Sequence, residues 1–136
     1  MPTDAHQLAR SVARMNRRLR QERQSDLTPT QLSVLGAVLK IGPATPSAIA
    51  AHERVRPPSI TRTLTHLVDE GLAIREPHPD DGRQVLISLA DKGDAVLAEE
   101  RTRRDLWLGH RLAELTTDER ATLREAAALL ERLAQS

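Results

Sequence analysis

The chain has 136 residues, a formal net charge of +1 and no cysteine. This length is sufficient for one domain whose hydrophobic core needs neither disulfides nor metal. The absence of cysteine excludes disulfides, thiolate zinc sites, cysteine nucleophiles and thiol-based redox sensing. No segment approaches the roughly 18 apolar residues of a membrane span, and the first residues lack the apolar region of a secretory signal. We therefore expect a soluble, cytoplasmic protein without a membrane partner.

The charge is distributed unevenly along the chain. Residues 1–62 contain ten basic and four acidic side chains, a net +6, whereas residues 63–136 contain ten and fifteen, a net −5. Such asymmetry predicts a basic surface for an anionic partner. Trp107 is the only aromatic residue, and proteins that bind RNA or single-stranded DNA depend on aromatic side chains for base stacking. The composition therefore favours duplex DNA.

Residues 4–23 have the pattern of an amphipathic helix with a narrow apolar stripe among arginines. Leu8, Val12, Met15 and Leu19 follow one another at helical spacing. Because the rest of this helix is polar, the stripe needs a partner helix, either inside the domain or on another subunit.

Two helices are expected next, each opened by a capping residue and a proline. Thr28 and Gln31 form a capping box around Pro29, and the helix that follows is apolar on nearly all sides until Gly42 and Pro43 end it. Thr45 and Pro46 repeat the signal for a short helix that ends near His52. The first of these helices should form the buried centre of the domain.

A third helix begins at Pro57–Pro58 and ends before Gly71. Its inner face is apolar, and its outer face is polar, with Pro58, Ser59, Thr61, Arg62 and Thr65. Two short helices joined by a tight turn, of which the second is amphipathic, form a helix-turn-helix pattern. We also expect free N–H groups at the start of this helix to face phosphate.

A β-hairpin follows, with strands at 72–76 and 84–89 joined by a loop rich in proline, aspartate and glycine. A hairpin in this place is a wing. A long charged helix over 91–113 and a last helix from the capping box at Thr116 to about residue 134 complete the chain. The sequence thus predicts a mainly α-helical fold with a small β-hairpin wing, a winged helix-turn-helix over about 28–89 within a single domain 1–136.

The helix from Pro57 and the wing loop carry groups suited to duplex DNA. Arg62 can bind guanine O6 and N7 in the major groove, while Ser59, Thr61 and Thr65 reach phosphates or base edges. Arg83 in the wing loop can enter a minor groove, and Asp81 can orient it by a charge-assisted hydrogen bond. The alternatives are a solvated polar helix face and an ordinary surface ion pair.

The order and spacing of these elements resemble the multiple antibiotic resistance regulator (MarR) family over nearly the whole chain. The matching positions are Leu27, Thr28, Gln31 and Leu35, then Pro58, Ser59, Thr61, Arg62, Leu64 and Leu67, then Gly71, Leu72, Asp81, Arg83, Leu89 and Gly93. The family usually has a threonine that caps the helix after the wing, and this chain has Ala90 there.

The resemblance implies a homodimer that binds a pseudo-palindromic operator, with a small-molecule effector that releases the DNA, and it favours a repressor. The terminal segments, about 1–25 and 91–136, would form the dimer. The expected dimer contacts are Leu8, Val12, Met15, Leu19, Leu123 and Leu130. The expected DNA contacts are Ser47, Arg56, Pro58, Ser59, Thr61, Arg62, Thr65 and Arg83, with Asp81 as support for the wing.

Three other functions are alternatives for this sequence. An enzyme is disfavoured because Asp80 and Asp81 lie in a turn without a substrate pocket, and because the five histidines lack metal-ligand spacing. We therefore expect no catalysis, no metal and no cofactor. A metal-sensing regulator with a site across helices, and a helix-turn-helix module that binds protein instead of DNA, stay open as alternatives.

Overall fold

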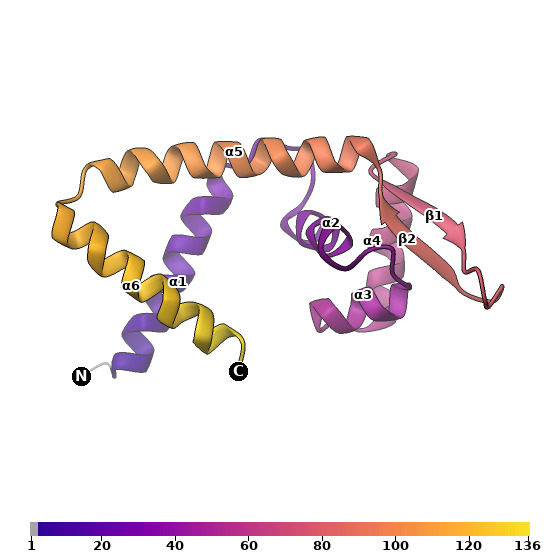
Figure 1. The fold of residues 1–136 in the computed structure, drawn as a ribbon, viewed down its shortest axis with the longest axis horizontal. Coiled ribbons are helices and arrows are strands. Elements are labelled where there is room, and N and C mark those ends of the chain that lie inside the picture. The colour runs from indigo at the N-terminus through magenta and orange to yellow at the C-terminus, as the bar shows by residue number, and fades with distance from the viewer. Residues whose placement is uncertain (1–2) are drawn as a thin grey trace. The chain divides into compact units, whose positions relative to one another are not determined.

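A computed structural model describes residues 3–136 (Figure 1). The elements, in chain order, are α1 (Asp4–Gln21), α2 (Pro29–Ile41), α3 (Pro46–Glu53), α4 (Pro57–Asp69), β1 (Ala73–Pro77), β2 (Val85–Leu89), α5 (Asp91–Ala113) and α6 (Thr117–Ala134). This confirms the predicted fold class, a mainly helical chain with one two-stranded antiparallel hairpin. No helix in this part of the chain has the length and apolarity that crossing a membrane requires.

The chain divides into two compact units. Residues 23–102 form one, here called the core unit, and α1 with residues 103–136 forms the other, here called the helical unit. The boundary falls inside α5, within the segment 91–136 that is expected to form the dimer. The first turns of α5 therefore belong with the winged helix-turn-helix.

The hydrophobic core lies in the core unit alone. Every buried apolar side chain of the described residues falls between positions 32 and 87; the largest are Leu35, Ile49, Ile60, Leu64, Leu67 and Ile87. They come from α2, α3, α4 and β2, which pack against one another (Figure 1). The apolar periodicity of α2 and α4 is thus explained by burial within this unit.

Threonine side chains cap α2, α3 and α6 at the predicted positions. The Thr28 hydroxyl accepts a hydrogen bond from the Gln31 N–H while the Gln31 side chain accepts one from the Thr28 N–H, and Thr116 and Glu119 make the same exchange. Both predicted capping boxes are confirmed. The hydrogen bonds from the backbone N–H and hydroxyl of Thr116 lower the pKa of Glu119 below its ordinary value.

Strand β2 connects the wing to the helix-turn-helix. It pairs with β1 in a register that places Ala73 opposite Leu89 and Pro77 opposite Val85. Its central residue Ile87 also exchanges two backbone hydrogen bonds with Ala44, at 2.8 and 3.0 Å, in the segment between α2 and α3. The base of the hairpin is thereby held, while its tip extends past the helices (Figure 1).

The start of α5 is joined to the end of α4 through the backbone of Leu72. Its carbonyl oxygen accepts a hydrogen bond from the N–H of Ala90 at 3.1 Å, and the Ala90 carbonyl accepts the first helical bond of α5 from Asp94 at 3.0 Å. A Cβ added to Gly93 would collide with the same Leu72 oxygen. Backbone contacts therefore position this helix start, where the family pattern has a threonine side chain.

Two side chains of α5 make further contacts inside the core unit. The Lys92 Nζ donates a hydrogen bond to the Glu70 carbonyl oxygen at 2.9 Å. One carboxylate oxygen of Glu100 accepts hydrogen bonds from the backbone N–H groups of Gln24, at 3.3 Å, and Ser25, at 2.8 Å. These contacts hold the segment before α2 and the end of α4 against the same helix.

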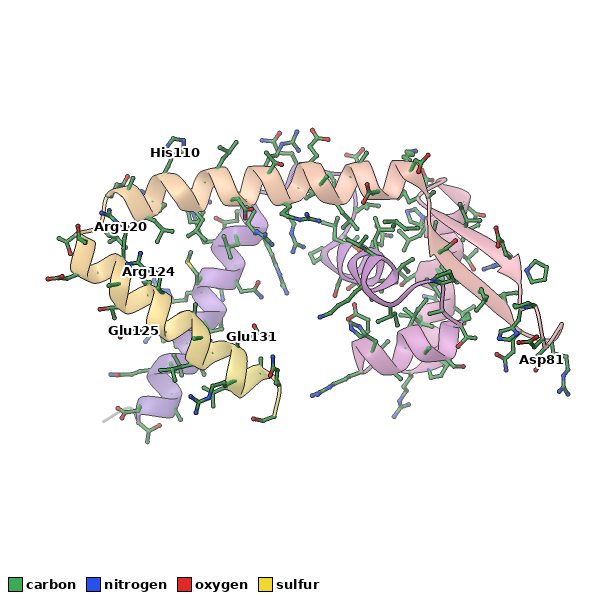
Figure 2. All side chains as sticks on the ribbon, in the orientation of Figure 1. Asp81, His110, Arg120, Arg124, Glu125 and Glu131 are labelled. Carbon is green, nitrogen blue, oxygen red and sulfur yellow. The ribbon has the colours of Figure 1, made fainter. Side chains whose placement is uncertain are left out.

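The helical unit contains no buried residue among those described. Within it, the guanidinium carbons of Arg18 and Arg111 lie 4.6 and 5.7 Å from the ring centre of Trp107, within the range of cation–π attraction. The Arg120 Nη1 closes the turn between α5 and α6 by donating a hydrogen bond to the Leu115 carbonyl oxygen at 2.7 Å (Figure 2). The described helices of this unit therefore enclose no hydrophobic core.

Gly93→Ala should lower the free energy of unfolding by about 1–3 kcal/mol, because the new Cβ would force α5 away from the Leu72 carbonyl. Gly36→Ala is the matched control. Its added Cβ meets no atom within 4 Å, and alanine favours a helix over glycine by about 0.5–1 kcal/mol. Chemical denaturation measures the free energy of unfolding of both variants. A Gly93→Ala variant as stable as the wild type would show that the close approach does not constrain α5.

Candidate nucleic-acid interface

The outer face of α4 presents all five of its sequence-predicted DNA contacts to solvent. Ile60, Leu64 and Leu67 are turned into the core, each no more than 1% exposed. The exposed positions on the other side are Pro58, Ser59, Thr61, Arg62 and Thr65. Arg56, the N-cap residue, is exposed as well, and neither it nor Arg62 has an ion-pair partner among residues 3–136. The face is positively charged and free to meet an anion.

The expectation that free N–H groups at the start of α4 face phosphate is wrong. Pro57 and Pro58 occupy its first two positions and carry no N–H. The next two N–H groups, of Ser59 and Ile60, both donate to the Arg56 carbonyl oxygen, at 3.1 and 3.4 Å. Any contact that this end of the helix makes with an anion must therefore come from side chains.

The start of α3, unlike that of α4, has a free backbone N–H group that can face an anion. Thr45 caps this helix by accepting a hydrogen bond from the Ala48 N–H at 3.2 Å, and Pro46 is its first residue. Ser47 follows and is exposed, and neither its N–H nor its hydroxyl has a partner among the described residues. The N–H and the hydroxyl of Ser47 can therefore both donate hydrogen bonds to one phosphate group.

Two of the hydroxyl groups predicted to contact DNA from α4 already have hydrogen-bond partners, which restrict the further bonds that they can make. The Thr61 hydroxyl donates to the Pro57 carbonyl oxygen at 3.1 Å, which leaves its lone pairs as acceptors. The Thr65 hydroxyl lies 3.5 Å from the Nη2 of Arg75, an exposed residue of β1 that sequence reasoning missed. No spacing rule links residues 65 and 75, because their proximity depends on how the wing packs beside α4.

The wing loop holds Asp81 against Arg83. The Asp81 Oδ1 accepts hydrogen bonds from the backbone N–H of Arg83 at 3.0 Å and from its Nε at 3.3 Å. The Arg83 side chain is 93% exposed, and the Asp81 side chain 33%. Asp81 lies near the tip of the hairpin (Figure 2). Because Asp81 engages only Nε, the terminal nitrogens of the guanidinium group face solvent.

The residues expected to form a dimer are exposed on the helical unit. Leu8 and Val12 on α1 and Leu123 on α6 are each 46% exposed, whereas Leu19 is half-buried. Met15 and Leu130 are each 39% exposed. Sequence reasoning missed three further exposed leucines, Leu106, Leu129 and Leu133, because it followed one apolar stripe per helix. Each of these apolar side chains is thus left uncovered in the single chain.

The core unit contains a cavity of about 360 Å³ at the junction of three segments. It lies between the segment before α2, the end of α4 and the start of α5, and is lined by Ser25, Asp26, Leu27, His66, Glu70, Leu72, Lys92 and Val96. Within residues 3–136, no three histidine or acidic side chains are placed to hold a metal ion.

Comparisons with known proteins agree on one family. The family model described as MarR family matches residues 25–84. An HTH-type transcriptional regulator of Mycobacterium leprae is 45% identical over 127 residues, which cover 93% of this chain and 89% of the relative. The multiple antibiotic resistance protein MarR of Salmonella typhimurium is 35% identical over 99 residues, 72% of this chain and 69% of that protein.

A solved structure shows the same architecture. The crystal structure of a transcriptional regulator protein from Pseudomonas aeruginosa is 37% identical in sequence and superimposes with a TM-score of 0.82. The match covers 97% of this chain and 93% of that one. The order of the helices and the wing hairpin along the chain is therefore shared over nearly the whole length.

Proposed function

This chain belongs to the MarR family of transcription regulators, and on that premise we propose that it binds duplex DNA sequence-specifically as a homodimer. In this proposal α4 is the recognition helix, the helix that enters the major groove. The observation that carries it is the exposed polar face of α4, with Arg62 unpaired at its centre and the wing arginine beyond it.

Each contact on the interface has a role set by its chemistry. Arg62 donates to guanine O6 and N7, the base contact that discriminates best in the major groove. The Thr61 lone pairs accept from an exocyclic amine of adenine or cytosine, since its proton is engaged with Pro57. Ser47 and Arg56 contact phosphates and set the register. Arg83 enters the minor groove beside the major-groove site.

The dimer is proposed because the helical unit has no core of its own. Its apolar side chains stay exposed in a single chain, and a second copy with the same surface can cover them across a two-fold axis. Such a dimer presents two recognition helices to half-sites about one helical turn apart. Two-fold symmetry in the protein then corresponds to a pseudo-palindrome in the DNA.

We propose that the protein is a repressor that responds to a small molecule, as its family resemblance implies. The cavity in the core unit has a volume within the range of small-molecule sites, about 300–1,000 Å³. It contacts both the end of α4 and the start of α5. A molecule bound there would bear on the recognition helix and on the helix that leads into the dimer-forming segment.

Arg62→Ala should cost about 1–3 kcal/mol of binding free energy on the preferred operator and relax discrimination at one base pair of each half-site. Arg83→Ala should weaken binding more uniformly across sequences. Titrations against an operator and its single-base-pair variants measure both effects. Arg124→Ala, on the exposed surface of α6 (Figure 2), is the control and should leave affinity unchanged. If neither substitution changes the affinity for the operator, the assignment of both arginines to the interface is wrong.

Affinity for duplex DNA should fall steeply as salt concentration rises, because each neutralised phosphate releases counterions. The slope of log K against log salt should be about −0.9 for each phosphate contacted. Two titrations at different salt concentrations separate this proposal from a helix-turn-helix module that binds protein. Absence of a salt-dependent affinity for duplex DNA would favour that module instead.

Val12→Asp should dissociate the dimer, because it places a charge in the apolar surface that the second copy covers. Val55→Asp is the matched control, a valine of nearly equal exposure, 44% against 46%, in the turn before α4. Sedimentation equilibrium should find dimers for the wild type and Val55→Asp and monomers for Val12→Asp. A monomeric wild type would contradict the proposed assembly.

A further inference from the structure

The wing loop is closed by a histidine side chain. The Nδ1 of His78 accepts hydrogen bonds from the backbone N–H groups of Asp80 and Asp81, each at 3.1 Å. The His78 N–H donates to the Gln84 carbonyl oxygen at 3.1 Å across the base of the same loop. One imidazole nitrogen therefore fixes two consecutive peptide groups at the turn of the wing.

The second of these residues is the one that holds Arg83. The Asp81 N–H donates to the His78 Nδ1, and the Asp81 carbonyl oxygen accepts from the Gln84 N–H at 3.0 Å. The Asp81 carboxylate accepts from Arg83. A continuous series of hydrogen bonds thus runs from His78 through Asp81 to the arginine. Because the Arg83 side chain is 93% exposed, the orientation of its guanidinium depends on this series.

We propose that His78 is a positioning residue for Arg83, and that the wing is set for DNA only while the His78 ring is neutral. This inference rests on the proposed function, in which Arg83 contacts DNA. A neutral imidazole has one acceptor nitrogen, and here that nitrogen is Nδ1, so the proton is on Nε2. A second proton makes Nδ1 a donor that points at two other donors, and both loop-closing bonds are lost.

The charged neighbours of His78 do not replace the lost bonds. The charged side chains of the two strands and their loop are Arg75, Glu76, Asp80, Asp81 and Arg83, since β2 carries none. The carboxylates of Asp80 and Asp81 attract a protonated ring, but in that arrangement the ring donates to them. The Asp81 carboxylate would then be drawn away from Arg83. The backbone N–H groups of Asp80 and Asp81 would also lose the imidazole nitrogen that accepts from them.

A double-mutant cycle tests whether His78 acts through Arg83. His78→Ala should lower affinity for the operator about three- to tenfold, the size expected for losing a loop hydrogen bond. The same change made in an Arg83→Ala background should have little further effect, because the side chain being positioned is gone. An equal loss in both backgrounds would overturn the proposal and leave His78 with a general structural role.

A pH series separates positioning by a neutral ring from simple packing. An asparagine oxygen can accept from the backbone N–H two residues on and does not titrate. His78→Asn should therefore bind nearly as the wild type does at about pH 7.5, and lose less affinity than the wild type at about pH 5.5, with salt held constant. His110→Asn, exposed on α5 (Figure 2), should retain the wild-type pH dependence. Identical profiles for His78→Asn and the wild type would overturn the proposal.

NMR spectroscopy of the free protein separates failure of this inference from failure of the proposed function. The imidazole nitrogen shifts should show the Nε2–H tautomer of His78, and the amide signals of Asp80 and Asp81 should move together with its protonation. If those amides do not follow His78, the inference is overturned even for a protein that binds DNA. If they do follow it in a protein that binds no duplex DNA, only the proposed function fails.

Discussion

The backbone of Leu72 is the point on which the arrangement of the core unit depends. Its N–H donates to the Leu67 carbonyl oxygen of α4 at 2.9 Å, and its carbonyl oxygen accepts from the Ala90 N–H at the end of the hairpin. Gly93 of α5 approaches that same oxygen more closely than any residue with a Cβ could. The backbone N–H and carbonyl groups of this one residue thus join α4, the wing and α5. A displacement of the first turns of α5 must therefore move α4 and the wing, and in the proposed function this is the physical route by which an effector acts.

The two units of the chain differ in what holds them together. The core unit buries apolar side chains from four elements, so its geometry is a property of a single chain. The helical unit buries none and leaves leucines on α5 and α6 more than half exposed. The fold of the core unit and the pairing of two chains therefore depend on different sets of side chains. The proposed function requires both, because one recognition helix reads only half of an operator.

Much of the fold could be predicted from the sequence, because local signals and burial agree. The period of Ile60, Leu64 and Leu67 on α4, and the capping boxes at Thr28 and Thr116, correspond to helices at the expected positions. The contacts of the candidate interface were harder to predict from the sequence. Glu100 holds a backbone segment 75 residues away, Arg75 meets Thr65 only after the wing has packed, and the acceptor role of His78 depends on the orientation of one ring. None of these contacts has a periodic signature, and the double proline at 57–58 was interpreted as a helix start without regard to the N–H groups it removes.

The central claim, that a symmetric pair of these chains reads duplex DNA through α4, is tested most directly by selecting genomic fragments that the purified protein retains. The expected result is a set of fragments that share an inverted repeat, with half-site centres about 10 base pairs apart, one turn of the duplex. Enrichment of unrelated sequences, or of a single unpaired half-site, would contradict the claim.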